Sequence, residues 1–196
     1  QGTQMANTKA IKNMIKLNVP KDKILECYSE EEYKSTVGCI KHIKSDKVIL
    51  MMKETPHDFF LTHPDNSYIR KMNRPTIVEF DSGNEYSGQG VVANTWPEYT
   101  MKRWGSYINC PNVTGYVART DRYGDTSIVG TANEIQLYAL KRMTEEQTVS
   151  PMQIYNEFIT SRYGEDALLP IRKAFQNAYD IVTSVFYTLG TNLTDH

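Results

Sequence analysis

The chain has 196 residues, of which 40% are hydrophobic and 11% aromatic, enough to bury a core of ordinary size in one domain or one and a half. Its 22 Lys and Arg residues nearly balance its 23 Asp and Glu residues, which gives a formal net charge of -1. No long-range field therefore selects a polyanion or an anionic membrane, and we expect neither nucleic acid nor a membrane as a partner.

Helices and short apolar runs alternate along the first three quarters of the chain. Asn7 can cap a helix through about residue 17, and Ser29 with Glu32 forms a capping box for a helix through about residue 43. Three continuous apolar runs predict buried parallel strands, at 47–53, 75–80 and 113–118. Further helices are expected at about 65–73, 97–107 and 131–142. Strands that alternate with helices in this way are typical of βα units, so we predict an α/β fold.

Beyond residue 148 the pattern is helical only. Ser150 and Pro151 begin one helix in the favoured order of cap and first residue, and Gly164 ends it. One longer helix is expected from about 166 to 189, with apolar residues at three-and-four spacing. We therefore divide the chain into residues 1–148, which carry the βα units, and residues 149–196, a helical C-terminal segment.

Ionisable residues follow each of the three predicted strands. They are Lys53, Asp58, Glu85, Arg119, Asp121 and Arg122. Because ligands of parallel βα proteins bind at the carboxyl ends of the strands, we expect these side chains at one rim. Two carboxylates across a pocket, roughly 6.5 to 9.5 Å apart, are what inverting glycosidases use. A plain alternative stays open, in which the same residues are solvated or ion-paired loop side chains.

Two motifs in this region resemble the catalytic barrel of the α-glucuronidases, the glycoside hydrolases that remove 4-O-methylglucuronic acid from xylan. Residues 53–59 match the family's Lys-x-x-x-x-Asp-Phe motif, and residues 79–89 match its Glu-Phe-x-x-x-x-Glu-Tyr-x-Gly-Gln motif. The separation of Asp58 and Glu85 agrees with the family's to within a residue. A tryptophan-bearing helix, with Trp96 or Trp104, a glycine-led strand with a polar loop at 115–124 and the helical segment at 150–190 are also similar.

The resemblance implies the C-terminal part of a (β/α)8 barrel of the TIM type, followed by a helical appendage. It implies an inverting glycoside hydrolase that acts on a uronic-acid-bearing glycan, with water activated by Asp58 or Glu85. Lys53 matches a residue that binds the uronate carboxylate, and a charge-assisted hydrogen bond suits that role. The other residues expected to bind the carbohydrate substrate are His57, Tyr86, Trp96, Arg119, Asp121, Arg122 and Tyr123, the last of which replaces a tryptophan of the family.

The general acid of the family lies upstream of the matching segment, and no residue before Lys53 has its sequence context. We therefore expect the chain to need the N-terminal half of the barrel, either from a complementary chain or a longer polypeptide, or else to form a homo-oligomer that covers its open sheet. The alternative, from a different functional class, is a non-catalytic carbohydrate-binding or structural fragment of such an enzyme.

No cofactor and no metal are expected. His63 and Asp65 lack a second histidine at ligand spacing, and the three cysteines at 27, 39 and 110 lack the spacing of a zinc site. No apolar run approaches the ~20 residues that span a bilayer. Glycosylation sequons at Asn112 and Asn192 leave the cellular compartment open.

Overall fold

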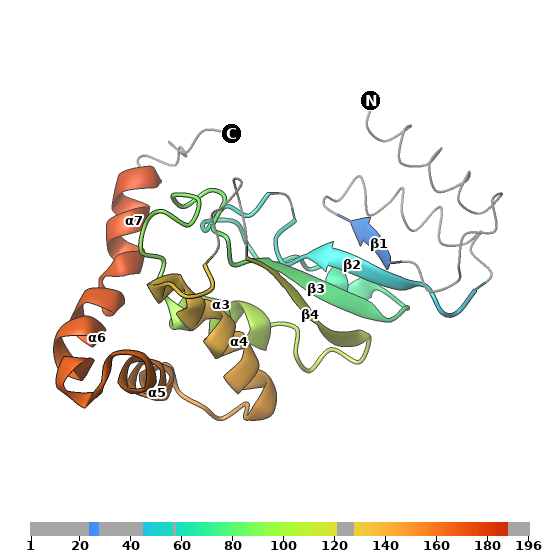
Figure 1. Cartoon of the computed structure of the whole chain (residues 1–196). Helices are drawn as coiled ribbons and strands as arrows, with labels where there is room; N and C mark the ends of the chain where they lie inside the picture. The colour runs from blue at the N-terminus through green and yellow to red at the C-terminus, as the bar shows by residue number, and fades with distance from the viewer. Residues whose placement is uncertain (1–23, 28–44, 57, 121–127, 188–196) are drawn as a thin grey trace. The chain divides into compact units, whose positions relative to one another are not determined.

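The computed structural model describes residues 45–56, 58–120 and 128–187, together with the backbone of 24–27 (Figure 1). The helices predicted near 7–17 and 29–43 lie outside these residues. So do four of the expected substrate-binding residues, His57, Asp121, Arg122 and Tyr123.

The strands lie side by side in one sheet, in the order in which they occur in the chain, β1-β2-β3-β4. They are β1 (Ile24–Cys27), β2 (Ile49–Lys53), β3 (Thr76–Asp81) and β4 (Val113–Arg119). β1 pairs with β2, and β2 with β3, in parallel. β4 is joined to β3 where both begin, since the Thr76 backbone N–H donates to the Asn112 carbonyl at 2.7 Å. The α/β class is confirmed, strands form at all three predicted places, and the parallel direction is confirmed for β2 and β3. The prediction that the third strand is buried is wrong, because no side chain of β4 is buried. β1 is an additional strand.

Cross-strand pairs of buried side chains hold β2 against β3. Leu50 is paired with Thr76 and Met52 with Val78, and all four side chains are buried. Burial of an aliphatic side chain of this size contributes about 1.5–3 kcal/mol relative to exposure. The next pair in register is Lys53 with Glu79, also buried. The apolar run that identified β2 therefore ends on a charged residue at the carboxyl end of the strand.

The helix predicted at about 65–73 is wrong, because only the 3-10 turn η1 (Ile69–Lys71) forms there. Asn66 explains the difference. Its Oδ1 accepts the Tyr68 backbone N–H at 3.1 Å, and its Nδ2 donates to the Lys53 carbonyl at 3.0 Å. Asn side chains that bond nearby backbone groups favour turns over helices.

The chain divides into two compact units. The first consists of the described residues within Gln1–Asp58, His63–Glu79 and Asn109–Val117, and it holds β1, β2, η1 and most of β3 and β4. The second consists of those within Phe59–Thr62, Phe80–Ile108 and Ala118–His196. The helical C-terminal segment thus belongs to the same compact unit as the two helices that precede it.

Helices form the second unit. α3 (Pro97–Gly105) packs against α4 (Ile135–Glu145) and α5 (Pro151–Tyr163), and the 3-10 turn η2 (Ala132–Glu134) leads into α4. The helices predicted at about 97–107 and 131–142 are confirmed. Their common core is apolar and consists of Met101, Ile135, Ala139, Val149, Ile154, Tyr155, Phe158, Ile159 and Phe175.

Both predicted ends of α5 are confirmed. Ser150 is the N-cap, and its hydroxyl accepts the Gln153 backbone N–H at 3.2 Å, while the Gln153 side chain accepts the Ser150 N–H at 2.8 Å. This reciprocal arrangement is a capping box. Gly164 ends the helix with φ +87°, a left-handed conformation that glycine adopts without strain.

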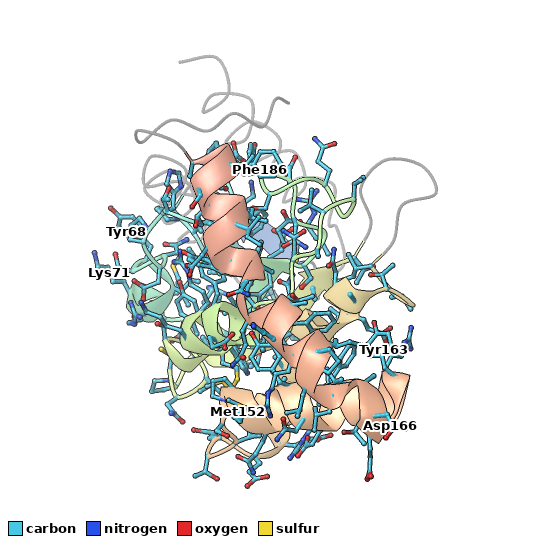
Figure 2. All side chains as sticks on the ribbon, turned by 90° about the vertical axis from the view of Figure 1, so that its left-hand side faces the viewer. Tyr68, Lys71, Met152, Tyr163, Asp166 and Phe186 are labelled. Atoms are coloured by element: carbon cyan, nitrogen blue, oxygen red, sulfur yellow. The ribbon has the colours of Figure 1, made fainter. Side chains whose placement is uncertain are left out.

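The single long helix predicted from about 166 to 189 is wrong. The segment contains η3 (Glu165–Ala167), α6 (Leu168–Gln176) and α7 (Ala178–Phe186), with Asn177 between the two α-helices (Figure 1). The break divides the apolar stripe. Phe175 and Val182 are buried, whereas Ile181 and Val185 are 58% and 54% exposed. Figure 2 shows α7 ending at Phe186. None of the helices in the described part of the chain is long and apolar enough to cross a membrane.

Candidate functional site

Lys53 and Asp58 form an ion pair in the first unit, with 2.9 Å between Nζ and Oδ1. The lysine ends β2, and its side chain is only 9% exposed, whereas the Asp58 side chain is 49% exposed. The Asp58 carbonyl is 3.2 Å from the His63 Nδ1. The mostly buried cation therefore orients a carboxylate that reaches solvent.

Backbone hydrogen bonds fix the chain where β2 ends. The Glu54 N–H donates to the Glu79 carbonyl at 3.0 Å, and the Asn66 N–H donates to the Glu54 carbonyl at 2.7 Å. The side chains of Glu54 and Glu79 are themselves buried. Sequence reasoning did not select these two acids as site residues, because the pairing of Glu79 with Lys53 depends on the register of β2 and β3, which alternation within a strand does not give.

Glu85 and Arg119 form an ion pair in the second unit, with 3.5 Å between Oε2 and Nη1. Their side chains are 13% and 33% exposed. The Arg119 guanidinium also lies over the Phe59 ring, 5.8 Å from its centroid, within the range of a cation–π contact. The Glu85 backbone N–H donates to Asp81 Oδ2 at 2.7 Å, which fixes the start of the loop after β3.

Residues 82–96, which we call the Glu85 loop, connect β3 to α3. Four of its residues have left-handed backbone conformations, namely Asn84 at φ +59°, Gly88 at +89°, Gln89 at +53° and Gly90 at +79°. A Cβ at Gly88 would lie 2.5 Å from the Val92 Cγ2, so this position requires glycine for space as well as for backbone conformation. These backbone conformations and the lack of space at Gly88 therefore restrict the backbone of the loop to one closely specified path.

Tyr86 and Trp96, two of the three aromatic residues expected to bind a sugar, are buried in the second unit. Tyr86 packs against Phe60 with ring centroids 4.1 Å apart, and its carbonyl accepts the Tyr187 hydroxyl at 2.8 Å. Trp96 packs edge-to-face on Tyr179 at 5.6 Å. Burial raises the pKa of the Tyr187 phenol, consistent with its place under the loop. Tyr86 and Trp96 are thus residues of the Glu85 loop whose side chains are buried in the second unit.

The described site residues form two carboxylate–cation pairs, one in each unit. Lys53 and Asp58 belong to the first unit, and Glu85 and Arg119 belong to the second. Among the residues that the structure describes, no group of three or more His, Cys, Asp and Glu side chains is arranged to hold a metal ion.

No protein-family model matches the chain, and a comparison with curated proteins finds no match.

Proposed function

We propose that the chain is part of an inverting glycoside hydrolase that acts on a uronic-acid-bearing glycan, as α-glucuronidases do. The observation that carries the proposal is that two adjacent parallel strands are each followed by a carboxylate paired with a cation. These pairs are Lys53 with Asp58 and Arg119 with Glu85. Ligands of parallel βα proteins bind at this end of the strands.

Inversion needs one carboxylate to remove a proton from water as the water oxygen attacks the anomeric carbon. A separate acid gives a proton to the departing glycosidic oxygen. We assign the first role to Asp58 or Glu85. The exposed Asp58 carboxylate can contact water directly, and the Glu85 carboxylate is held in a closely specified loop. The acid is assigned to a part of the enzyme outside the segment that resembles the family.

Lys53 is the proposed ligand of the uronate carboxylate, and Arg119 is proposed to contact the sugar elsewhere. A lysine has three N–H donors, which form strong charge-assisted hydrogen bonds with carboxylates. Such bonds select an acidic sugar over a neutral one and orient its ring. His57, Asp121, Arg122 and Tyr123 are proposed to contribute further contacts.

We further propose that the chain is part of a (β/α)8 barrel. Such a barrel needs eight strands, more than the structure describes. The remaining strands would come from a complementary barrel half. A helical C-terminal segment, α5 to α7, would follow the barrel.

The full protein as its gene encodes it is tested on xylo-oligosaccharides that carry 4-O-methylglucuronic acid. Asp58→Asn and Glu85→Gln are compared with the wild type. Loss of a general base reduces kcat by about 10²–10⁴-fold, and we expect a loss in this range for the residue that activates water. Calorimetric titration should show that both variants still bind the substrate. Unchanged kcat in both variants would refute the assignment.

The stereochemistry of the released sugar tests the mechanism separately. Proton NMR early in the reaction should show the anomer opposite to that of the substrate, because direct attack by water inverts the centre. Retention would contradict the proposal. A wild-type protein that binds the decorated oligosaccharide without cleaving it would favour the carbohydrate-binding alternative.

Lys53→Ala tests the substrate class. We expect weaker binding of uronate-bearing oligosaccharides by about tenfold or more, since a charge-assisted hydrogen bond contributes about 1.5–3 kcal/mol. Binding of undecorated xylo-oligosaccharides should change little. Lys141→Ala, at an exposed lysine of α4, is the matched control. An equal loss for acidic and neutral ligands would show that Lys53 does not select the uronate.

A further inference from the structure

The polar side chains of the Glu85 loop are buried, although the loop carries a candidate catalytic group. Asn84, Ser87 and Asn94 all lie in the interior of the second unit. A buried amide without hydrogen bonds is costly, so the loop can keep this conformation only if other residues satisfy these groups. The Nδ2 groups of Asn84 and Asn94 donate to backbone carbonyls within the loop. Residues of η2 and α4, about 40 to 50 positions later in the chain, bind the Asn84 Oδ1 and three backbone groups of the loop.

Asn133 of η2 binds the second half of the loop. Its Oδ1 accepts the Asn94 backbone N–H at 2.7 Å, and its Nδ2 donates to the Val92 carbonyl at 2.9 Å. Asn133 is itself fixed, because its backbone N–H donates to the Thr131 hydroxyl at 3.2 Å. One buried amide therefore satisfies two backbone groups that lie two residues apart.

Gln136 of α4 connects the two halves of the loop. Its Nε2 donates to the Asn94 carbonyl at 2.7 Å and to the Asn84 Oδ1 at 3.2 Å. Its Oε1 is 3.5 Å from the Thr100 hydroxyl of α3. The side chain is buried, so water does not compete for these bonds.

Asn84 transmits this contact to Glu85, the next residue in the chain. Its backbone has φ +59°, and its Nδ2 donates to the Ser82 carbonyl at 2.7 Å. Its own carbonyl accepts the N–H groups of Ser87 at 3.0 Å and of Gln89 at 2.8 Å. Asn84, the residue that precedes Glu85, is therefore held through both its side chain and its backbone.

We infer that Gln136, assisted by Asn133, is a positioning residue for Glu85. It acts through Asn84 and Asn94 and fixes the direction in which the Glu85 carboxylate leaves the loop. The catalytic part of this inference rests on the proposed function, in which that carboxylate serves the attack of water. A misplacement of about 1 Å in such a group can reduce the rate about 10²-fold. A buried side chain on a rigid helix that holds Glu85 in place therefore contributes to the rate.

Hydrogen exchange on the full protein tests whether Gln136 holds the loop, without any reference to activity. In Gln136→Met, which keeps the length of the side chain but removes the amide, exchange of residues 82–96 should become about tenfold faster. Gln153→Met is the matched control, because it makes the same change at the capping box of α5 in the same unit. It should leave exchange of the Glu85 loop unchanged. Unchanged exchange in Gln136→Met would overturn the inference.

A double-mutant cycle tests whether the effect reaches catalysis through Glu85. In the wild-type background, Gln136→Met should reduce kcat about 10- to 100-fold and leave KM within about twofold. In the Glu85→Gln background, the same change should alter kcat by less than about threefold, because the group that it positions is already lost. Equal losses in both backgrounds would show a merely structural role and overturn the inference.

Asn84→Gly provides a second variant in case Gln136→Met does not fold. Glycine accepts the left-handed backbone at this position and removes the side-chain amide, which Gln136 contacts and which also donates to the Ser82 carbonyl. It should reproduce the faster exchange and the loss of kcat, and normal values of both would contradict the inference. A wild-type protein without hydrolytic activity would refute the proposed function and the catalytic role of Gln136. The exchange measurement would still decide whether Gln136 holds the loop.

Discussion

The Lys53–Asp58 pair and the Glu85 loop hold a carboxylate after a parallel strand in different ways. Asp58 is oriented by a cation five positions earlier in the chain, and its side chain is 49% exposed. Glu85 is carried by a loop that is bound by buried residues of η2 and α4, and its side chain is 13% exposed. The first arrangement is local and open to solvent, and the second depends on tertiary structure.

The two carboxylates should therefore differ in which substitutions elsewhere in the chain leave their positions unchanged. The Lys53–Asp58 pair persists wherever β2 ends in the same way, because Lys53 is the last residue of β2 and Asp58 follows five positions later. The Glu85 loop persists only if α4 is packed correctly, since Gln136 reaches it from there. We therefore expect the geometry of the Glu85 loop to be the more sensitive to substitutions in the core of the second unit.

The largest stability effect is expected at Gly88. Gly88→Ala combines an unfavourable backbone conformation with a Cβ that would approach Val92, and should lower the free energy of unfolding by about 3 kcal/mol. Denaturant unfolding measures the change. Gly115→Ala is the matched control, because nothing lies within 4 Å of a Cβ there. Equal effects at both glycines would contradict the closely specified path of the loop.

Asn66 provides the corresponding test in the first unit. Asn66→Ala removes hydrogen bonds to the Lys53 carbonyl and from the Tyr68 N–H, and we expect a loss of about 1–3 kcal/mol. Asn73→Ala, at an exposed asparagine of the same unit, should change stability by less than about 0.5 kcal/mol. If the two variants were equally stable, Asn66 would not be needed to support the end of β2.

Ser150→Ala measures the cost of losing a local contact that lies outside both carboxylate sites. Loss of the N-cap of α5 should reduce stability by about 1 kcal/mol. Hydrolytic activity, where present, should not change at temperatures at which the protein stays folded. A specific loss of kcat in this variant would show that the geometry of the Glu85 loop depends on α5 as well as on α4.

The smallest effect is expected on the pH dependence of stability, and it comes from the contact between α4 and α5. The Arg142 guanidinium, which donates to Glu157 Oε2 at 2.8 Å, lowers the pKa of the Glu157 carboxyl. Stability from this contact is present above the unfolded value of about 4.3 and is lost as pH falls through the lower folded value. Because the carboxylate is about one third exposed, we expect only a few tenths of a kcal/mol.

Urea unfolding of the wild type and Glu157→Gln measures this difference. The wild type should be slightly more stable near pH 7, and the two curves should converge below about pH 4. A difference that grew towards acidic pH would have the wrong sign for a carboxyl whose pKa is lowered by folding.

Much of the fold follows from local patterns in the sequence. The runs that predicted β2, β3 and β4 have bounds within two residues of those of the observed strands. Burial of apolar side chains explains this agreement for β2 and β3, whereas no side chain of β4 is buried. The four-residue β1 was missed, since so short a run carries little periodicity. The break at Asn177 was missed because the apolar spacing continues through it, even though asparagine is a weak helix former.

The candidate site could be predicted only where its contacts are local. The spacing of Lys53 and Asp58 at a strand end placed both residues together, and they form an ion pair. The contact of Gln136 with Asn84 joins residues 52 positions apart, and no periodicity in the sequence indicates it. Trp96 was expected to face a sugar, yet Tyr179 of α7 covers it, a contact that depends on how the helices pack. The catalytic roles of Asp58 and Glu85 stay predictions.

The capping box at Ser150 makes the connection before α5 a convenient place for protein engineering. Residues 145–148 are exposed, and the hydrogen bonds that begin α5 come from Ser150 and Gln153 and not from the preceding residues. A peptide inserted after Gln147 would therefore leave both helix ends intact. Each doubling of such a flexible insert would cost only about 0.6 kcal/mol in chain entropy. An epitope or a fluorescent reporter could be introduced there.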